Sequence, residues 1–208
     1  MRTVNLGWLI VAAALLSAIG CGEGGPGTAN LSAETEVKAE SVSFHLLDLD
    51  GKAADLWQDG PAKATVLIFT QSDCPISNRY APDIRALYDK FHPQGVNFYL
   101  VFVDPQQTPD AIRSHMSEYG YPCPALRDPE HSFAAFTGAT VTPEAVVFDA
   151  QRQIVYRGRI DDLFVDFGKS RTVATTHDVA EAIEATLAGR PVAEPVTKAV
   201  GCYISDLQ

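Results

Sequence analysis

The sequence predicts an α/β domain with a central mixed β-sheet flanked by helices, and three features of its pattern support this fold class. Two apolar runs rich in β-branched and aromatic residues, 65–70 and 96–103, are typical of strands buried on both faces of a sheet. The amphipathic segment 78–91 lies between them, and the order strand, helix, strand indicates a parallel crossover. Segments 145–149 and 153–159 indicate a hairpin, which adds antiparallel strands to the sheet.

Turn and capping signals predict a hairpin before the strand at 65–70 and a helix after the strand at 96–103. Segment 44–57 should form an N-terminal β-hairpin, because the dipeptide Asp50-Gly51 suits the positive φ angles of a tight two-residue turn. Residues 109–119 should form a helix, since the Thr108 hydroxyl can cap it and a proline opens its first turn.

The last predicted element of the domain is a helix at 177–188. Thr176 provides its capping side chain, and Gly189 ends it. The folded domain is therefore expected to extend over residues 41–190. The remaining residues, 191–208, are expected to form a C-terminal tail that carries one cysteine and is mobile enough to swing over the domain.

Composition and charge limit the classes of function. The chain has 208 residues, of which 46% are hydrophobic and 20% charged, so it can bury a core, and disorder or a coiled coil is disfavoured. Sixteen basic residues stand against 26 acidic ones, which gives a formal net charge of −10. This charge works against attraction to nucleic acid or to an anionic bilayer, so we expect no nucleic-acid partner.

The amino terminus has the profile of a secretory signal peptide. Residues 1–20 carry one positive charge, at Arg2, followed by the apolar run 6–16 and small residues that lead to Cys21. The run is shorter than the roughly 20 residues that a membrane-spanning helix needs. The residues before Cys21 resemble a bacterial lipobox, with Ala18 where leucine is commoner. Lipidation of Cys21 is therefore the expectation, and ordinary cleavage or a retained anchor are the alternatives.

The signal profile also predicts a location. Residues 21–40 are rich in Gly, Ala, Thr and Glu without a hydrophobic period, and they are expected to form a flexible tether. The domain would then lie in the bacterial cell envelope, facing the periplasm or the exterior, and would contact the membrane only through its lipid anchor. Disulfides persist in that environment.

Four cysteines are too few for a disulfide-built scaffold, so each is interpreted individually. Cys74 follows the predicted strand 65–70 and directly precedes a helix. The positive end of a helix favours a thiolate by about 0.3–1 kcal/mol, and loops at strand ends are usually exposed. Cys74 is therefore the candidate nucleophile, and a buried structural cysteine is the alternative. His131 and His177 lack ligand spacing, so neither a metal site nor another cofactor is expected.

The motifs around Cys74 resemble the thioredoxin fold. They are the strand 65–70, the Cys74 loop, Pro82 in the following helix, and Thr142-Pro143 before the strand 145–149. Within that superfamily, residues 41–189 are similar to peroxiredoxin-like redoxins of the alkyl hydroperoxide reductase and thiol-specific antioxidant group. The resemblance implies that Pro143 follows a cis peptide bond and faces the cysteine. It also implies that the backbone of Thr142 is free to bind an extended substrate.

The sequence departs from the standard sites of these families. Thioredoxin-type enzymes carry Cys-x-x-Cys, but Ser77 occupies the second position, so no disulfide can join Cys74 to it. Peroxiredoxins carry their peroxide-reacting cysteine at that second position. What remains is one nucleophilic sulfur that can form a mixed disulfide or a sulfenic acid, which another thiol must then resolve.

Two other cysteines could supply the resolving thiol. Cys123 lies before a predicted short strand at 125–127, and Cys202 lies in the tail. A mobile tail could reach the Cys74 loop, which favours pairing of Cys74 with Cys202. The alternative is a structural Cys123–Cys202 bridge that leaves Cys74 alone.

The expected function is that of a thiol-dependent oxidoreductase acting by thiol–disulfide exchange or peroxide reduction. Cys74 would attack, Thr142 and Pro143 would shape the substrate groove, and Cys202 or Cys123 would resolve the intermediate. The partners would be a protein or small-molecule disulfide or peroxide and an external thiol reductant. Two alternatives are a non-catalytic binding module and a copper-delivery protein, although the Cys-x-x-x-Cys spacing of the latter ends at Asn78.

Overall fold

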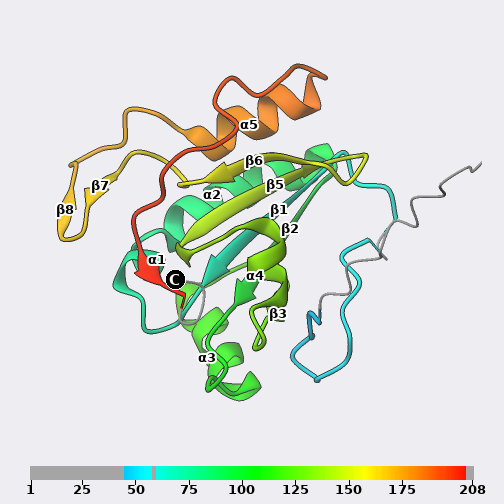
Figure 1. Ribbon diagram of the computed structural model, residues 1–208, viewed down its shortest axis with the longest axis vertical. Helices are drawn as coiled ribbons and strands as arrows, with labels where there is room; N and C mark the ends of the chain where they lie inside the picture. Colours follow the sequence, from blue (N-terminus) through cyan, green and yellow to red (C-terminus); the bar gives the residue numbers. More distant parts are fainter. Residues whose placement is uncertain (1–44, 58–59, 205–208) are drawn as a thin grey trace, which may run out of the picture. The chain divides into compact units, whose positions relative to one another are not determined.

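A five-stranded mixed sheet lies at the centre of the fold in the computed structural model, which describes residues 45–57 and 60–204 (Figure 1). Its strands are β1 (Ala64–Thr70), β2 (Val96–Phe102), β3 (Ala125–Arg127), β5 (Glu144–Asp149) and β6 (Ile154–Gly158). They lie in the order β3-β2-β1-β5-β6. Strand β2 is parallel to β1 and β3, whereas β5 is antiparallel to β1 and β6. The predicted α/β class and the mixed sheet are confirmed.

Strand β1 occupies the centre of this sheet because its side chains are apolar on both faces. Val66 and Ile68 belong to one hydrophobic cluster, and Leu67 and Phe69 belong to another on the opposite face. All four are at most 1% exposed. Burial of each such side chain stabilises the fold by about 1.5–3 kcal/mol, so this strand holds the two helical layers together.

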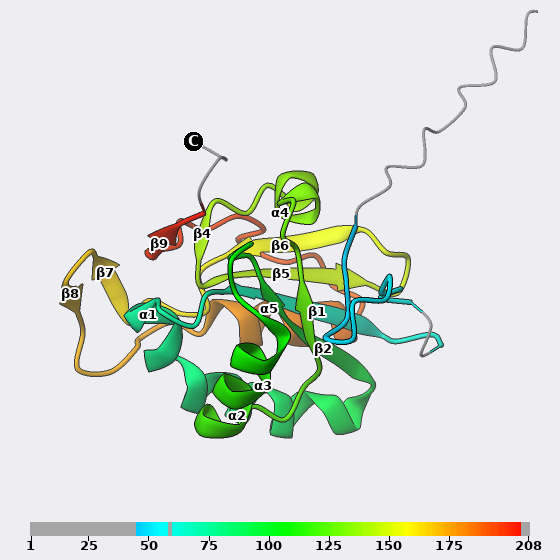
Figure 2. The ribbon, with the colours of Figure 1, turned by 90° about the horizontal axis from the view of Figure 1, so that it is seen from below.

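Helices cover both faces of the sheet. Helices α2, α3 and α5 contribute buried side chains to the cluster on one face, and α4 packs on the other (Figure 2). The helical elements are α1 (Pro75–Arg79), α2 (Ala81–Phe91), the short 3₁₀ helix η1 (His92–Gln94), α3 (Pro109–Tyr119), α4 (Ser132–Thr137) and α5 (Asp178–Leu187). Within the described ranges, no helix is long and apolar enough to cross a membrane.

The bounds of the three helices predicted from the sequence agree with the structure except at two points, and α4 was not predicted. The predicted helix at 78–91 is split at Tyr80, because Pro82 has no backbone N–H to continue the ladder and instead opens α2. Helix α3 has the predicted bounds, and the Thr108 hydroxyl accepts a hydrogen bond from Ala111 N at 3.3 Å. At α5 the N-cap is His177 rather than the predicted Thr176.

The N-terminal hairpin is reduced to its turn. The Asp48 carboxylate accepts hydrogen bonds from the backbone of Asp50 and Lys52, each at 2.8 Å, which closes the predicted turn. Regular strands do not form among residues 45–57, where Leu47 makes isolated bridges to Ala53 and to Arg127. The predicted residue 44 lies outside the described residues, as do the signal segment 1–20, Cys21 and the tether at 21–40.

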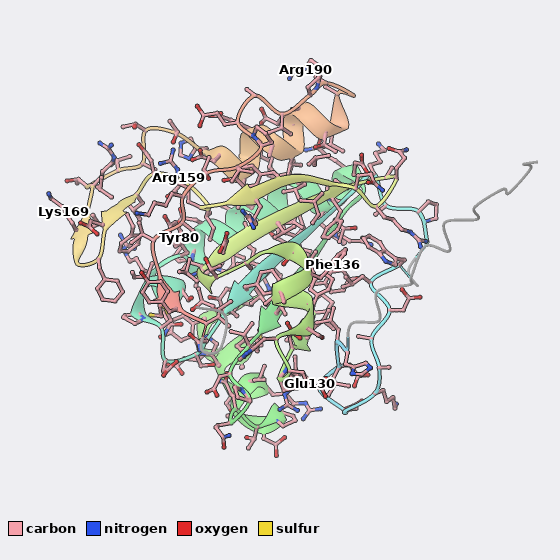
Figure 3. All side chains as sticks on the ribbon, in the orientation of Figure 1. Tyr80, Glu130, Phe136, Arg159, Lys169 and Arg190 are labelled. Carbon is pink, nitrogen blue, oxygen red and sulfur yellow. The ribbon has the colours of Figure 1, made fainter. Side chains whose placement is uncertain are left out.

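A second hairpin was not predicted from the sequence. Strands β7 (Phe164–Asp166) and β8 (Lys169–Ser170) project beside α1 in both ribbon views (Figures 1 and 2). Lys169 lies at the outer end of this hairpin (Figure 3). At its base the ring of Phe164 contacts that of Tyr80, with centroids 5.5 Å apart, so the hairpin packs against the end of α1.

The C-terminal segment is docked through residue 204, contrary to the expectation of a mobile tail. It first runs along β6, where Arg157 N donates to Pro195 O at 2.9 Å and Thr197 N donates to Arg157 O at 3.0 Å. It then forms β9 (Cys202–Tyr203), which pairs antiparallel with β4 (Val141–Thr142). The following Ile204 is completely buried. The docked residues belong to the same compact unit as the domain, Ser41–Gln208.

Replacing Thr197 by valine should loosen this docking. The Thr197 hydroxyl lies 2.6 Å from the Tyr156 hydroxyl and accepts a hydrogen bond from Arg159 N at 3.1 Å. Valine keeps the shape but leaves both groups without this partner, so we expect the free energy of unfolding to fall by about 1–3 kcal/mol. Urea unfolding would measure the loss. Thr172→Val, at an exposed position, is the control, and equal midpoints for the two variants would contradict the anchoring role.

Candidate redox site

Cys74 lies at the carboxyl end of the central strand, as the sequence predicts. Strand β1 ends at Thr70, and after a three-residue loop Cys74 becomes the N-cap residue of α1. Its backbone N–H donates to Gln71 O at 3.2 Å, which holds the loop in a tight turn. The side chain is only 1% exposed, which differs from the expectation of an exposed loop.

The segment that leads into β5 covers this sulfur from one side. The peptide bond between Thr142 and Pro143 is cis, as the resemblance implies. The Cys74 thiol donates a hydrogen bond to the carbonyl oxygen of Thr142 at 3.0 Å. The Thr142 hydroxyl in turn donates to the side-chain oxygen of Gln71 at 3.0 Å, so the two loops are joined directly.

The tail covers the sulfur from another side and brings a second thiol to it. Cys202 on β9 is paired with Thr142 on β4, and its Sγ lies 2.6 Å from the Sγ of Cys74. Gly201 makes this approach possible, because a Cβ at that position would overlap the carbonyl of Thr142. The Thr142 backbone is therefore not open to an extended substrate, since the chain's own tail occupies it.

Cys123 is not part of this cluster. It is buried in the core near Tyr121, and burial raises its pKa to about 12. Among the residues that the structure describes, no interaction joins its sulfur to that of Cys74 or Cys202. The structure thus brings the tail cysteine to Cys74, and it does not show the alternative bridge between Cys123 and Cys202.

Comparison with known proteins assigns the family. The family described as Redoxin matches residues 34–165, more than half of the chain. The chain belongs to the Redoxin family. No curated protein shows significant sequence similarity to this redoxin.

Solved structures confirm the thioredoxin-like fold of this redoxin. An uncharacterized conserved protein from Geobacillus kaustophilus is 29% identical, with a TM-score of 0.66 over 77% of this chain and 87% of the other. A hypothetical protein from Sinorhizobium meliloti 1021 is 26% identical, with a TM-score of 0.68 over 77% and 89%. A secreted Mycobacterium tuberculosis disulfide oxidoreductase homologous to E. coli DsbE is 21% identical, with a TM-score of 0.50 over 69% and 96%, and this likeness concerns the fold alone.

The pKa of Cys74 is lowered by its immediate neighbours. Burial raises the pKa of this thiol, but hydrogen bonds from Cys202 and from the backbone and side chain of Ser77 to the thiolate outweigh that effect. Helix α1 has only five residues, so its dipole stabilises a thiolate at Cys74 less than a long helix would. The redoxin therefore favours a thiolate at Cys74 through local donors.

Ser77 contributes to the environment of Cys74, whereas the sequence analysis considered it only as the position of a missing cysteine. Its hydroxyl is buried in the first turn of α1. While Cys74 is a neutral thiol, this hydroxyl has no hydrogen-bond partner among the described residues. An unpaired buried hydroxyl is costly, and donation to a Cys74 thiolate removes that cost. Its position three residues after an N-cap cysteine was the available signal.

Cys202 has the opposite electrostatic character. Burial, its hydrogen bond to Cys74 and the negative charges of Cys74 and Asp73 raise its pKa to about 12. The charge of Asp73, the residue before Cys74, thus acts on Cys202. The two sulfurs of the redoxin thus differ in pKa, which is lowered at Cys74 and raised at Cys202.

The two histidines considered as metal ligands have other places in the fold, one at a backbone carbonyl and one at the start of a helix. His131 Nε2 lies 2.7 Å from the carbonyl oxygen of Val103, and His177 is the N-cap of α5. Within residues 45–57 and 60–204, no three His, Cys, Asp or Glu side chains form a group that could hold a metal ion.

The pH dependence of alkylation should report the hydrogen bond between the sulfurs. A lowered pKa means a larger thiolate fraction at a given pH. Iodoacetamide should label the covered Cys74 of the reduced protein slowly, and the pH midpoint of the labelling rate should lie lower than in a variant that lacks these neighbours. Cys202→Ala removes a donor and should move that midpoint to higher pH. Quantitative mass spectrometry of the Cys74 peptide measures both. Cys123→Ala should leave the midpoint unchanged, and an unshifted midpoint in Cys202→Ala would contradict the interaction.

Proposed function

We propose that this redoxin is a thiol–disulfide oxidoreductase that cycles between two free thiols and a Cys74–Cys202 disulfide. The observation that carries the proposal is the 2.6 Å separation of the two sulfurs beside the cis-proline loop. Strand β9, which carries Cys202, is paired in register with β4, and the carbonyl of Thr142 on β4 accepts a hydrogen bond from Cys74, so backbone hydrogen bonding as well as the side chains places the two sulfurs together. The opposite pKa shifts support it, because a lowered pKa enlarges the thiolate fraction at Cys74, and the thiolate is the form that attacks the sulfur of a disulfide.

The chemistry balances with one external disulfide. In the oxidising direction the two thiols give up two electrons and two protons, an S–S bond forms between Cys74 and Cys202, and the external disulfide is released as two thiols. In the reducing direction two external thiols become a disulfide and the protein regains its thiols. Ser77 occupies the position of the second cysteine of a Cys-x-x-Cys motif and cannot form a disulfide. Cys202 supplies the second thiol instead, from the tail.

Peroxide reduction is the other reaction considered for a single cysteine of this group. It would convert Cys74 to a sulfenic acid, and Cys202 would then condense with it and release water. The contact of the buried Cys74 sulfur with the partly exposed Cys202 sulfur favours exchange between sulfurs over the addition of an oxygen atom at Cys74. We therefore propose thiol–disulfide exchange as the activity.

Disulfide mapping tests the proposal. The purified protein is incubated with excess oxidised glutathione, the remaining thiols are alkylated, and the digest is analysed by mass spectrometry. We expect a peptide pair joined through Cys74 and Cys202, with Cys123 alkylated. A Cys123–Cys202 pair, or complete alkylation of all three residues, would reject the proposed cycle. Oxidation by hydrogen peroxide at a much higher rate than by oxidised glutathione would instead support peroxide reduction.

We also propose that the redoxin acts in the bacterial cell envelope with a lipid on Cys21. The signal-like residues 1–20 and the lipobox-like residues before Cys21 support this location. A reversible disulfide also fits an oxidising compartment. Metabolic labelling with an alkyne fatty acid should mark the wild-type protein and not Cys21→Ser. Equal labelling of the two, or labelling of neither, would contradict the anchor.

A further inference from the structure

We propose that external thiols exchange with this redoxin at Cys202, and that Cys74 reacts only within the protein, with the Cys202 sulfur. This inference rests on the proposed thiol–disulfide cycle. It reverses the expectation from the sequence, in which Cys74 attacks the external substrate and the tail cysteine resolves the mixed disulfide.

Accessibility is the first argument. The Cys74 side chain is 1% exposed and belongs to the hydrophobic core, with the carbonyl of Thr142 on one side and Cys202 on another. Cys202 is partly exposed, and the next residue on its strand, Tyr203, is 68% exposed. An external sulfur can therefore reach Cys202 while the fold stays intact.

Access to Cys74 would require removal of the strand β9. That movement would break its pairing with β4, uncover the completely buried Ile204 and separate Ile204 N from Thr140 O, which are 3.0 Å apart. The tail is also held upstream by Thr197, whose backbone and hydroxyl are both hydrogen-bonded. These contacts keep Cys74 covered during exchange.

The chemistry of the leaving sulfur is the second argument. When an external thiolate attacks the Cys202 sulfur of the disulfide, an S–S bond forms to Cys202, the Cys74–Cys202 bond breaks, and Cys74 leaves with the electron pair as a thiolate. Thiols of lower pKa leave faster, and the neighbours of Cys74 lower its pKa. The opposite attack would expel Cys202, whose pKa is raised, and would be slower. The Ser77 hydroxyl, which is otherwise unpaired, can donate a hydrogen bond to the negative charge that develops on the Cys74 sulfur.

The cycle then closes without uncovering Cys74. A second external thiolate attacks the outer sulfur of the mixed disulfide, the Cys202 thiol is restored after it takes up a proton, and the external sulfurs leave as a disulfide. In the oxidising direction Cys202 first loses its proton and attacks the external disulfide, whose S–S bond breaks, so that a mixed disulfide forms at Cys202 and one external thiolate leaves. The Cys74 thiolate then attacks Cys202 and expels the external thiolate, which is the reverse of the first step.

Trapping of the mixed disulfide tests the assignment. Oxidised wild-type protein is mixed with reduced glutathione, quenched in acid after short intervals and digested. We expect glutathione on the Cys202 peptide in about tenfold or greater excess over the Cys74 peptide, because leaving-group acidity and access act in the same direction. Glutathione mainly on Cys74 would overturn the inference.

Two single-thiol variants separate this inference from the proposed function. With oxidised glutathione, Cys202 in Cys74→Ser should become glutathionylated faster than Cys74 in Cys202→Ser, and circular dichroism would verify that both variants fold. If the wild type forms no internal disulfide, the proposed cycle fails, and these variants still show which sulfur an external disulfide reaches. Faster modification of Cys74 in this comparison would reject entry at Cys202.

Discussion

Cys74→Ser will abolish formation of the internal disulfide and, with dithiothreitol as the reductant, will reduce the turnover of oxidised glutathione above the uncatalysed rate by at least about 100-fold. The reason is proximity, since an intramolecular thiol held in contact acts at an effective concentration far above that of a free thiol. Serine keeps the size of the side chain and can still donate to the carbonyl of Thr142, so the fold should persist. Turnover is measured by following glutathione release, and the fold by circular dichroism.

The control for this variant is Cys123→Ser. That cysteine is buried and makes no contact with the other two sulfurs among the described residues, so its replacement should retain turnover even if it lowers stability. Wild-type turnover in Cys74→Ser would reject the catalytic assignment. Equal losses in both variants would indicate damage to the fold rather than to the site.

Gly201→Ala will separate the two sulfurs. The new Cβ would overlap the carbonyl carbon and oxygen of Thr142, which belong to backbone and cannot rotate away. Overpacking of this kind typically costs about 1–3 kcal/mol, and displacement of β9 relieves it. We expect slower formation of the Cys74–Cys202 disulfide and faster alkylation of Cys74, because the strand that covers it has moved. The pKa of Cys74 should also rise as it loses the hydrogen bond from Cys202.

Gly189→Ala provides a matched control. Its Cβ would meet nothing within 4 Å, although the positive φ of 63° adds local strain. This variant should lose some stability, as Gly201→Ala does, but should keep the rate of disulfide formation and the protection of Cys74. Unchanged disulfide formation in Gly201→Ala, or an equal loss in both variants, would contradict the role of the close approach at Gly201.

Burial of Cys74 also bears on the alternative of a structural cysteine. Cys123 fits that description, since it is buried, without a sulfur partner in the described ranges, and of raised pKa. Cys74 is also buried, but it has a second thiol in contact and a lowered pKa. Burial therefore does not distinguish a structural cysteine from a candidate redox cysteine, whereas the groups that contact each sulfur do.

Local signals in the sequence were sufficient for the elements that position the site. The apolar run at 65–70 predicted the central strand, because a strand covered on both faces needs apolar residues at every position. Thr108 and Pro109 predicted α3 with its observed bounds, since capping depends on neighbours in the chain. The position of Cys74 at the end of the central strand and the turn at Asp50-Gly51 were also predicted, because both depend only on residues that are neighbours in the chain.

Only the tertiary structure decided how the tail meets this thiol. Cys202 lies 128 residues after Cys74, and its place depends on pairing between β9 and β4, on the missing Cβ of Gly201 and on the buried Ile204. Two-residue strands carry no periodic pattern, so composition alone suggested a mobile segment. The sequence determined that a cysteine stands at the end of a buried strand. Long-range packing decided which sulfur faces it and which of the two meets the solvent.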